Sequence, residues 1–314
     1  MYKSKSVLAF WSKTKSLLCD FSLTLFVKFW ILICDRIRPN YLRKGLAVGT
    51  LGTITSKDID KILSFLQDEV TKRGFSKVVL GLSGGIDSAV VALLCKKAFG
   101  ENMHALCMPS ISSSQQNLTD AKDFCARFSI PYTLLSIAPY QKAFLDQNAE
   151  SSPPTPLRVG NFCARIRMTL LYDFSQAHRA LVIGTSNRSE LMLGYGTIHG
   201  DLACALNPIA PFYKTQIFAL ARLLDIPRTI LEKAPSADLY PQQSDEKELG
   251  YSYEAIDPLL ACISQHYPTP QSMAGGIDKA RLVESGFAPA MVDSITARIT
   301  ANLFKQSLPL FLEV

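Results

Sequence analysis

Apolar and polar residues follow regular spacings from residue 56 onward. Apolar side chains recur at positions 59, 62, 63, 66 and 70, the spacing of an amphipathic helix, and this pattern ends at Gly74. Ser56 stands at the start of the pattern and is the predicted N-cap. The short apolar run 77–82 then predicts a buried strand, and residues 86–99 return to the helical spacing and stop before Gly100.

The alternation of strands and helices continues along the chain. The spacing predicts strands at 104–108, 132–135 and 180–183 and helices at 118–128, 161–176 and 214–224, with Asn161 capping the long helix. Beyond residue 202 the pattern is less regular and favours helices. Strands separated by helices predict right-handed crossovers, and hence an α/β fold with a doubly wound parallel sheet flanked by helices. Ligands bind such sheets at the carboxyl ends of the strands, so the loops after Leu82 and Ile183 are the candidate binding loops.

The basic charge of the chain lies in its first fifty residues. The formal net charge is +6, yet residues 1–50 hold nine Lys or Arg against two acidic residues, which leaves residues 51–314 close to neutral. A protein that binds the phosphate backbone of nucleic acid normally carries its positive charge on the folded face. We therefore expect no nucleic-acid partner.

Residues 1–55 form a basic, partly hydrophobic extension ahead of the predicted domain at 56–314. Its apolar stretch 21–34 has 14 residues with Lys28 in the middle, whereas a membrane-spanning helix needs about 20 apolar residues. Three interpretations stay open: an amphipathic segment on a membrane surface, a weak anchor, or translated sequence upstream of a start near Val48 or Leu51. Membrane contact through residues 1–50 is not the favoured interpretation.

The cysteines of the chain do not suggest a metal site. The eight cysteines include no CxxC pair, and the four histidines do not cluster with them. Several cysteines fall on apolar faces, as Cys95 does within VVALLCKKAF. Buried free cysteines are typical of proteins in a reducing compartment, so we predict a cytoplasmic protein.

The first candidate binding loop reads SGGIDS, residues 83–88, and joins a predicted strand to a predicted helix. Gly84 and Gly85 let the backbone turn tightly, and the N-terminus of the following helix points N–H groups at the same place. These features predict a site for phosphate groups. A carboxylate does not suit an anion site unless it holds a cation, so Asp87 predicts Mg²⁺ bridging the phosphates.

The loop differs from the P-loop of nucleoside triphosphatases, because GxxxxGK(S/T) is absent. It resembles the pyrophosphate-binding loop of the N-type ATP pyrophosphatases, which cleave ATP to AMP and pyrophosphate. The resemblance implies the adenine nucleotide alpha hydrolase-like fold, with ATP as co-substrate held by Gly81, Leu82, Ser83, Gly84, Gly85, Ile86, Asp87 and Ser88. Several ligases share this loop, so the loop alone does not name the acid that is activated.

Four further stretches narrow the resemblance to one family. They are RVGNFCARIRM at 158–168, LVIGTSNRSE at 181–190, the pair Asn207-Pro208 followed by Tyr213-Lys214-Thr215, and the polar loop KAPSADLYPQQSDEKELGYSYEAID at 233–257. Together they look like the NAD synthetases, in particular the short ammonia-dependent form. The resemblance covers residues from about 57 to 305.

The resemblance implies a role for individual side chains. Asp87 and Glu190, the glutamate of GTxxxxE, match the carboxylates that bind Mg²⁺. Thr185, Lys214 and Ser236 match further contacts to ATP. The family's contacts to the dinucleotide deamido-NAD match Arg165, Asp201 and Lys305.

Three positions depart from the family pattern. Many members carry TKxGDxxxDINP, whereas this chain reads TIHGDLACALNP, so Ile198 and Ala205 stand where a Lys and an Asp bind the dinucleotide. The C-terminal HK pair of the family is Phe304-Lys305 here, and only Lys305 can serve as a donor.

The resemblance implies the final step of NAD biosynthesis. Deamido-NAD would be activated by ATP as an acyl-adenylate, and ammonia would then give NAD, AMP and pyrophosphate without a protein nucleophile. The family also implies a homodimer whose interface helps to form the dinucleotide site. Glutamine as nitrogen donor would require an amidase domain, which the 56 residues at the start of the chain cannot house.

Other interpretations compete with this one. A tRNA-modifying ligase of the same superfamily would need a basic RNA-binding face, and a regulatory nucleotide-binding module would lack the metal carboxylates. Four single residues also have structural alternatives: Glu190 as a first-turn carboxylate, Arg165 as a surface charge, Lys214 as a solvated helix residue and Ser236 as a turn former.

Overall fold

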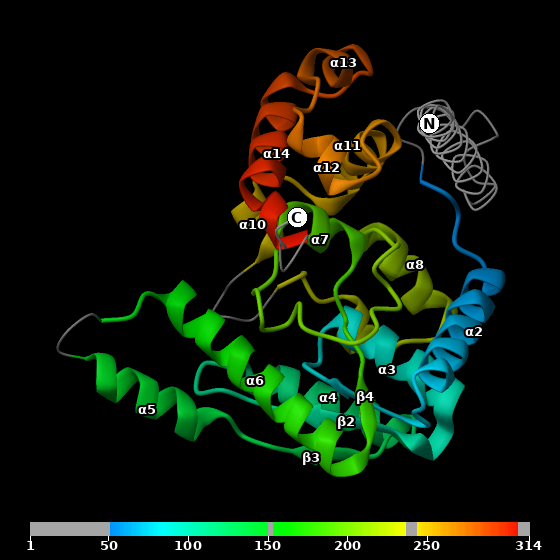
Figure 1. The fold of residues 1–314 in the computed structure, drawn as a ribbon, viewed down its shortest axis with the longest axis vertical. Coiled ribbons are helices and arrows are strands. Elements are labelled where there is room, and N and C mark those ends of the chain that lie inside the picture. Colours follow the sequence, from blue (N-terminus) through cyan, green and yellow to red (C-terminus); the bar gives the residue numbers. More distant parts are fainter. Residues whose placement is uncertain (1–50, 150–152, 237–243, 307–314) are drawn as a thin grey trace, which may run out of the picture. The chain divides into compact units, whose positions relative to one another are not determined.

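The computed structural model describes residues 51–149, 153–236 and 244–306. Within them, four parallel strands form one sheet in the order β3-β2-β1-β4 (Figure 1). The strands are β1 (Lys77–Gly81), β2 (Met103–Cys107), β3 (Tyr132–Leu134) and β4 (Ala180–Val182). The chain builds outward from β1 to β3 and then returns to the other side of β1, so the direction of winding reverses between β1 and β4. The predicted doubly wound parallel sheet is confirmed.

The strands β1, β2 and β4 are short apolar runs and are largely buried, whereas the edge strand β3 exposes Tyr132 and Leu134. Val78 and Leu80 of β1 belong to one hydrophobic core, while Val79, between them, belongs to a second core on the opposite face. This division follows from the alternation of side chains along a strand. Val79 pairs with His104 of β2 on one side and with Val182 of β4 on the other.

Helices cover the two faces of the sheet in separate layers. On the face of Val78 and Leu80 lie α2 (Ser56–Lys72), α3 (Ile86–Phe99), α4 (Gln115–Arg127) and α8 (Lys214–Leu223). On the opposite face, α6 (Pro156–His178) packs on β1 and β4, and α5 (Ala138–Asn148) packs on α6. Both predicted layers of helices are therefore present.

The remaining elements include a separate group of helices late in the chain. Figure 1 shows α11 to α14 gathered at one end of this part of the chain, away from the strands. They pack with α7 around the buried ring of Tyr253, in a core separate from the two that cover the sheet. The elements are α7 (Arg188–Leu193), α9 (Arg228–Leu231), α10 (Asp245–Leu249), α11 (Tyr253–His266), α12 (Pro270–Ala274), α13 (Lys279–Glu284), α14 (Pro289–Asn302) and the 3₁₀ turns η2 (Gly100–Asn102) and η3 (Leu303–Gln306).

Two predicted helix caps are wrong. Thr155, not Asn161, caps α6: its hydroxyl accepts a hydrogen bond from the backbone N–H of Arg158 at 3.3 Å, and Pro156 follows at the first helical position. Asn161, Arg165 and Arg167 consequently lie inside the helix and not at its start. Thr155-Pro156 is the stronger start signal, since proline lacks the N–H that an N-terminal residue would leave unpaired. In the same way Thr55, and not Ser56, caps α2.

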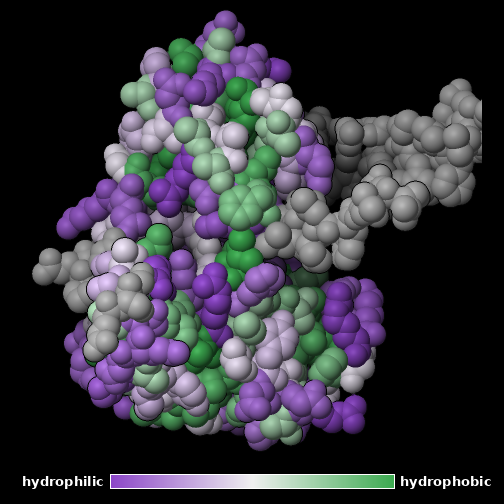
Figure 2. Space-filling view, turned by 60° about the vertical axis from the view of Figure 1, so that its left-hand side comes forward, coloured by the Kyte–Doolittle hydropathy of each residue, from purple (hydrophilic) through white to green (hydrophobic). Residues whose placement is uncertain are grey.

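The surface shows no single chemical character on the face drawn in Figure 2, where hydrophilic and hydrophobic side chains are mixed. Exposed apolar side chains such as Phe65, Leu157 and Phe304 come from different elements. Five of the six cysteines in the described ranges are buried, in line with the prediction from their apolar surroundings. No helix in those ranges is long and apolar enough to cross a membrane. The interpretations of residues 1–50 lie outside the described residues.

Candidate active site

The loop between β1 and α3 is fixed by close packing at Gly84. This residue has φ +83°, a conformation that side chains with a Cβ rarely adopt. A Cβ placed on it would lie 2.2 Å from the carbonyl oxygen of Asn117 in α4. Glycine at this position is therefore required twice, by the backbone conformation and by the approach of α4.

Two serine hydroxyls hold the loop in a closed turn. Ser88 Oγ donates to the carbonyl oxygen of Gly85 at 3.0 Å and lies 3.1 Å from Ser83 Oγ. Ser83 Oγ in turn accepts from the N–H of Gly85 at 3.2 Å. The N-terminus of the 14-residue helix α3 begins at the next residue, Ile86, so its unpaired N–H groups and positive dipole end meet at the turn. The predicted anion site has the local structure that such a site needs.

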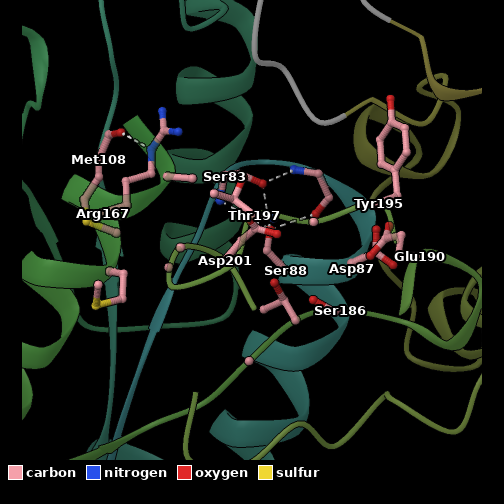
Figure 3. Close-up of a pocket in the computed structure, with 18 of the residues that line it drawn as sticks. Ser83, Asp87, Ser88, Met108, Arg167, Ser186, Glu190, Tyr195, Thr197 and Asp201 are labelled. Carbon is pink, nitrogen blue, oxygen red and sulfur yellow. Dashed lines mark hydrogen bonds between the residues drawn. The ribbon is translucent and has the colours of Figure 1, made fainter. Parts of the chain in front are cut away.

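Three charged side chains from three elements meet beside this loop. The ammonium of Lys214, at the start of α8, lies 2.5 Å from Asp87 Oδ2 and 3.1 Å from Glu190 Oε1. Lys214 is only 2% exposed, so the solvated alternative for this residue is wrong. Figure 3 shows Asp87 and Glu190 side by side. The two carboxylates predicted to share Mg²⁺ are thus brought together around one cation.

Asn187 sets the position of both carboxylates. Its side-chain amide donates to Asp87 Oδ1 at 2.9 Å, and its side-chain oxygen accepts from the N–H of Glu190 at 3.0 Å. Glu190 Oε2 accepts in return from the N–H of Asn187, which completes a capping box on α7. Glu190 is therefore a first-turn carboxylate and a member of the charged cluster at once.

Burial and mutual charge set the protonation of the cluster. Burial raises the pKa of Glu190 to about 8, with the nearby carboxylate of Asp87 acting in the same direction and the ammonium of Lys214 against it. Burial lowers the pKa of Lys214, but Asp87 and Glu190 outweigh it and the net shift is upward. The cluster therefore favours the charged form of Lys214 and raises the pKa of Glu190 above its ordinary range.

A cavity of about 680 Å³ opens at the carboxyl ends of β1, β2 and β4, where the sheet reverses its winding. Its size suits a large ligand. Of the predicted site residues, those that line it are Gly81, Leu82, Ser83, Gly85, Asp87, Ser88, Thr185, Glu190, Asp201, Ser236 and Lys305. Three further predicted site residues do not line the cavity: Gly84, Ile86 and Lys214. Ser236 is exposed, and its loop continues into 237–243, outside the described residues.

Arg165, the arginine that the family pattern indicates, does not line the cavity. Arg165 is exposed on α6, outside the cavity, and its Nε donates to the carbonyl oxygen of Ile198 at 3.2 Å. Arg167, two residues later, lines the cavity and donates to the carbonyl oxygen of Met108 at 3.0 Å. Figure 3 shows Arg167 and Met108 well apart from Asp87 and Glu190, so the cavity carries a cation at a distance from the charged cluster.

Asp201 and Lys305 belong to a polar wall of the same cavity. Asp201 Oδ1 accepts from the N–H of Thr197 at 3.0 Å, and Lys305 Nζ donates to the carbonyl oxygen of Gly194 at 2.7 Å. The hydroxyl of Thr197 donates to Asn161 Oδ1 at 2.8 Å. Ile198 and Ala205, the departures in the stretch TIHGDLACALNP, do not line this cavity.

Several cavity and cluster residues were not predicted from the sequence. Arg298 and Asn302 of α14 line the cavity, and Asn187 holds the two carboxylates. The spacing of Asn187 and Glu190 is that of a capping box, a signal that was available. Arg298 and Asn302 lie about a hundred residues further along the chain, and nothing local in the sequence marks them.

Comparison with known proteins identifies the family. The family model described as NAD synthase matches residues 58–309, which is most of the chain. The chain belongs to the NAD synthase family. The match agrees with the predicted resemblance and with the parallel sheet, whose neighbours among solved structures are NAD synthetases.

Individual relatives in the family are similar over nearly their whole length. The NH(3)-dependent NAD(+) synthetase of Helicobacter pylori is 54% identical over 257 residues, covering 81% of this chain and 96% of that protein. A solved structure of the NH3-dependent NAD synthetase of Campylobacter jejuni is 40% identical with a TM-score of 0.68, covering 82% of this chain and 99% of that one. A structure of NMN synthetase from Francisella tularensis is 33% identical with a TM-score of 0.69, covering 82% and 98%.

Proposed function

We propose that this member of the NAD synthase family amidates deamido-NAD with ammonia at the expense of ATP. The products are NAD, AMP and pyrophosphate, and the reaction passes through an acyl-adenylate. The proposal rests on the cluster of Asp87, Glu190 and Lys214 next to the loop 83–88, at the wall of a cavity of about 680 Å³. The H. pylori relative named for this activity supports it.

The charged cluster fits a magnesium ion. Among the described residues no group of three or more His, Cys, Asp or Glu is arranged to hold a metal. Mg²⁺ is commonly bound by one or two carboxylates together with substrate phosphates and water, and Asp87 and Glu190 supply two oxygen ligands at the wall of the cavity. With one ammonium against two carboxylates, the ionised cluster has a net negative charge. Bound there, Mg²⁺ would neutralise the charge on the phosphates and on departing pyrophosphate.

In the first step, the nicotinate carboxylate oxygen of deamido-NAD bonds to the α-phosphorus of ATP, and the bond to the bridging oxygen of pyrophosphate breaks. No protein nucleophile is required. The unpaired N–H groups at the N-terminus of α3 would bind the leaving phosphates, and the turn of Ser83, Gly85 and Ser88 would hold that end of the helix in place. Lys214 would hold the carboxylates of Asp87 and Glu190 in place beside the bound phosphates.

In the second step, ammonia attacks the acyl carbon of the adenylate and AMP leaves with the bonding electrons. The nitrogen releases one proton as the amide forms. The chain's contribution here is to hold the adenylate in place and to keep water away from its acyl carbon. The walls of the cavity, at the carboxyl ends of β1, β2 and β4, would surround the reacting groups and keep water away from them.

One related substrate is an alternative at this site. The F. tularensis protein of similar fold is named NMN synthetase, and its product is an amide of a mononucleotide. The same adenylation chemistry would serve nicotinate mononucleotide, which lacks the AMP half of deamido-NAD. The higher identity to NH(3)-dependent NAD(+) synthetases favours the dinucleotide.

The test is formation of NAD by the purified protein from deamido-NAD, ATP, Mg²⁺ and ammonium, with nicotinate mononucleotide as the competing acid. We expect kcat/KM to be higher for deamido-NAD, because the chain is more similar to the NH(3)-dependent NAD(+) synthetase of H. pylori than to the NMN synthetase of F. tularensis. Higher kcat/KM for the mononucleotide would reassign the substrate. Absence of both amide formation and ATP–pyrophosphate exchange would contradict the proposal.

The two carboxylates give the sharpest variants for this assay. Asp87→Asn and Glu190→Gln keep the size of the side chains and remove their charge, so we expect pyrophosphate release to fall by about 10²-fold or more. Glu254→Gln, an exposed acid on α11, is the matched control. Release at the parent rate by both site variants would refute the role of the cluster.

We also propose that the chain is a cytoplasmic homodimer, as the family resemblance predicts. Arg165 is exposed and outside the cavity, where it is accessible to a partner subunit or to the part of a ligand that extends beyond the cavity.

A further inference from the structure

Asp257 is a fully buried carboxylate that the reaction described above does not use. It lies on α11 in the apolar stretch AIDPLL and is 0% exposed. A buried carboxylate is costly unless its oxygens accept hydrogen bonds, so its partners indicate what it does. Both oxygens are in fact occupied, and both lead to the charged cluster.

Each oxygen of Asp257 bonds a direct chain neighbour of a cluster residue. Oδ1 accepts from the hydroxyl of Ser189 at 2.6 Å, and Ser189 immediately precedes Glu190. Oδ2 accepts from the N–H of Thr215 at 2.8 Å and from its hydroxyl at 2.7 Å, and Thr215 immediately follows Lys214. One carboxylate thus ties the first turn of α7 to the first turn of α8.

Ser189 closes the connection between the two helices. Its hydroxyl donates to Asp257 and also accepts from the backbone N–H of Lys214 at 2.9 Å. Ser189 is fully buried, so no water competes for these bonds. Asp257 and Ser189 therefore hold the backbones of α7 and α8 together. The distance of 3.1 Å between Lys214 Nζ and Glu190 Oε1 depends on this connection as well as on the attraction of the two charges.

We propose that Asp257 is a positioning residue for the reaction: through Ser189 and Thr215 it fixes Glu190 against Lys214. The inference rests on the proposed function, because it assigns the network to the placement of that site's carboxylate and ammonium. Side chains that stabilise developing charge must be held within about 0.5 Å of their working geometry, and a displacement of about 1 Å can lower a rate by about 10²-fold. Asp257, Ser189 and Thr215 do not line the cavity, so they act through the residues beside them.

The test uses hydroxyl deletions, because Asp257→Asn removes a buried charge and can prevent folding. Ser189→Ala and Thr215→Val each break one link to Asp257, while Thr215→Ser keeps the hydroxyl. Thr296→Val is the control: Thr296 is buried on α14, and its hydroxyl bonds the carbonyl oxygen of Val292 at 2.6 Å, away from the site. Pyrophosphate release, kcat and KM for ATP, and the thermal midpoint are measured for the full chain.

For Ser189→Ala and Thr215→Val we expect kcat to fall about 10-fold or more while KM for ATP changes by less than about threefold. Thr215→Ser and Thr296→Val should stay within about twofold of the parent kcat, although Thr296→Val loses stability as the other deletions do. Parent-like kcat in Ser189→Ala and Thr215→Val, with only their thermal midpoints lowered, would overturn the proposal. An inactive parent protein would instead overturn the proposed function.

Discussion

At the scale of single residues, the site depends on positions where only one side chain fits. Gly84 has a positive φ and lies against the backbone of Asn117, and Lys214 is buried with its charge between two carboxylates. Such residues cannot be exchanged for similar ones, because the surrounding atoms leave neither space nor compensating charge. Their substitution tests the geometry of the loop directly.

Gly84→Ala should damage both the loop and its function. The methyl group would lie 2.2 Å from the carbonyl oxygen of Asn117, so the loop must move, and we expect kcat/KM for ATP to fall about 10-fold or more. Gly74→Ala is the control, since Gly74 has φ +75° but open space around it. The control should lose about 1 kcal/mol of stability and keep its activity. Equal activity loss in both variants would show that the contact with α4 is unimportant.

His104 gives a pH-dependent contribution to stability. Burial, together with the nearby His178, lowers its pKa, and its Nε2 lies 2.9 Å from Thr133 Oγ1 while its ring stacks on Phe174. A histidine with a lowered pKa in the folded state stabilises that state above its unfolded pKa of about 6.5, and this contribution is lost as the pH falls.

The variant His104→Phe keeps the stacking and removes the titration. Its destabilisation, measured by urea unfolding, should be larger at pH 7.5 than at pH 5.5, by less than about 1 kcal/mol. A destabilisation independent of pH would show that His104 has an ordinary pKa. Phe174 carries no titratable group and cannot serve as a control for charge. The comparison variant is His178→Phe, on the helix α6 that also carries Phe174.

The sequence predicted these residue-scale features unevenly. Asp87 was singled out because a carboxylate follows the two glycines of the loop, and Glu190 because the GTxxxxE stretch resembles that of the family. The burial of Lys214 was not predictable, since its position at a helix start is typical of solvated lysines as well. Asp257 was missed because nothing near it in the chain shows that a serine 68 residues earlier bonds to it.

At the scale of elements, α4 and the segment that begins at Lys233 support the phosphate loop from outside. Lys233 Nζ lies 2.5 Å from Asp120 Oδ2, donates to Asn117 Oδ1 at 2.8 Å and to the carbonyl oxygen of Gly84 at 3.2 Å. One side chain therefore connects the loop, α4 and the segment that carries Ser236. Removing its charge would leave the buried Asp120 without its cation.

Lys233→Met should lower stability by about 1–3 kcal/mol and raise KM for ATP more than it lowers kcat, because the loop loses its support while the charged cluster stays intact. Lys233→Arg keeps the positive charge, so its stability and its KM for ATP should be close to those of the parent protein. Lys279→Met is the control, since Lys279 pairs with Asp293 on the exposed surface. An unchanged KM in Lys233→Met would show that the loop keeps its shape without this link.

The elements that the sequence predicted well are those with a strong period and a clear end. The strands β1 to β4 and the helices α2, α3 and α8 lie within a few residues of their predicted bounds. α5 and the short helices around α11 were not predicted individually, because their few apolar positions belong to packing partners far along the chain. The cap of α6 was wrongly placed at Asn161 because the pair Thr155-Pro156 was not considered as a helix start.

At the scale of the whole molecule, the predicted homodimer is open to a direct test. Light scattering after size exclusion should give a mass about twice the 34.6 kDa of the chain. If the site extends across the interface, Arg165→Ala should raise KM for deamido-NAD and leave KM for ATP unchanged, whereas Arg179→Ala, at the other end of α6, should alter neither. A monomeric and fully active protein would contradict the dimer.

The ion pairs of Lys214 have a practical consequence for handling the protein. Because this lysine already balances much of the negative charge of Asp87 and Glu190, the folded state does not require magnesium to relieve their repulsion. Dialysis against a chelator should leave the melting midpoint nearly unchanged while it stops turnover. If the proposed magnesium site is correct, the metal content of a preparation would be no measure of how much of it is correctly folded, and stocks stored metal-free would be activated by adding the ion.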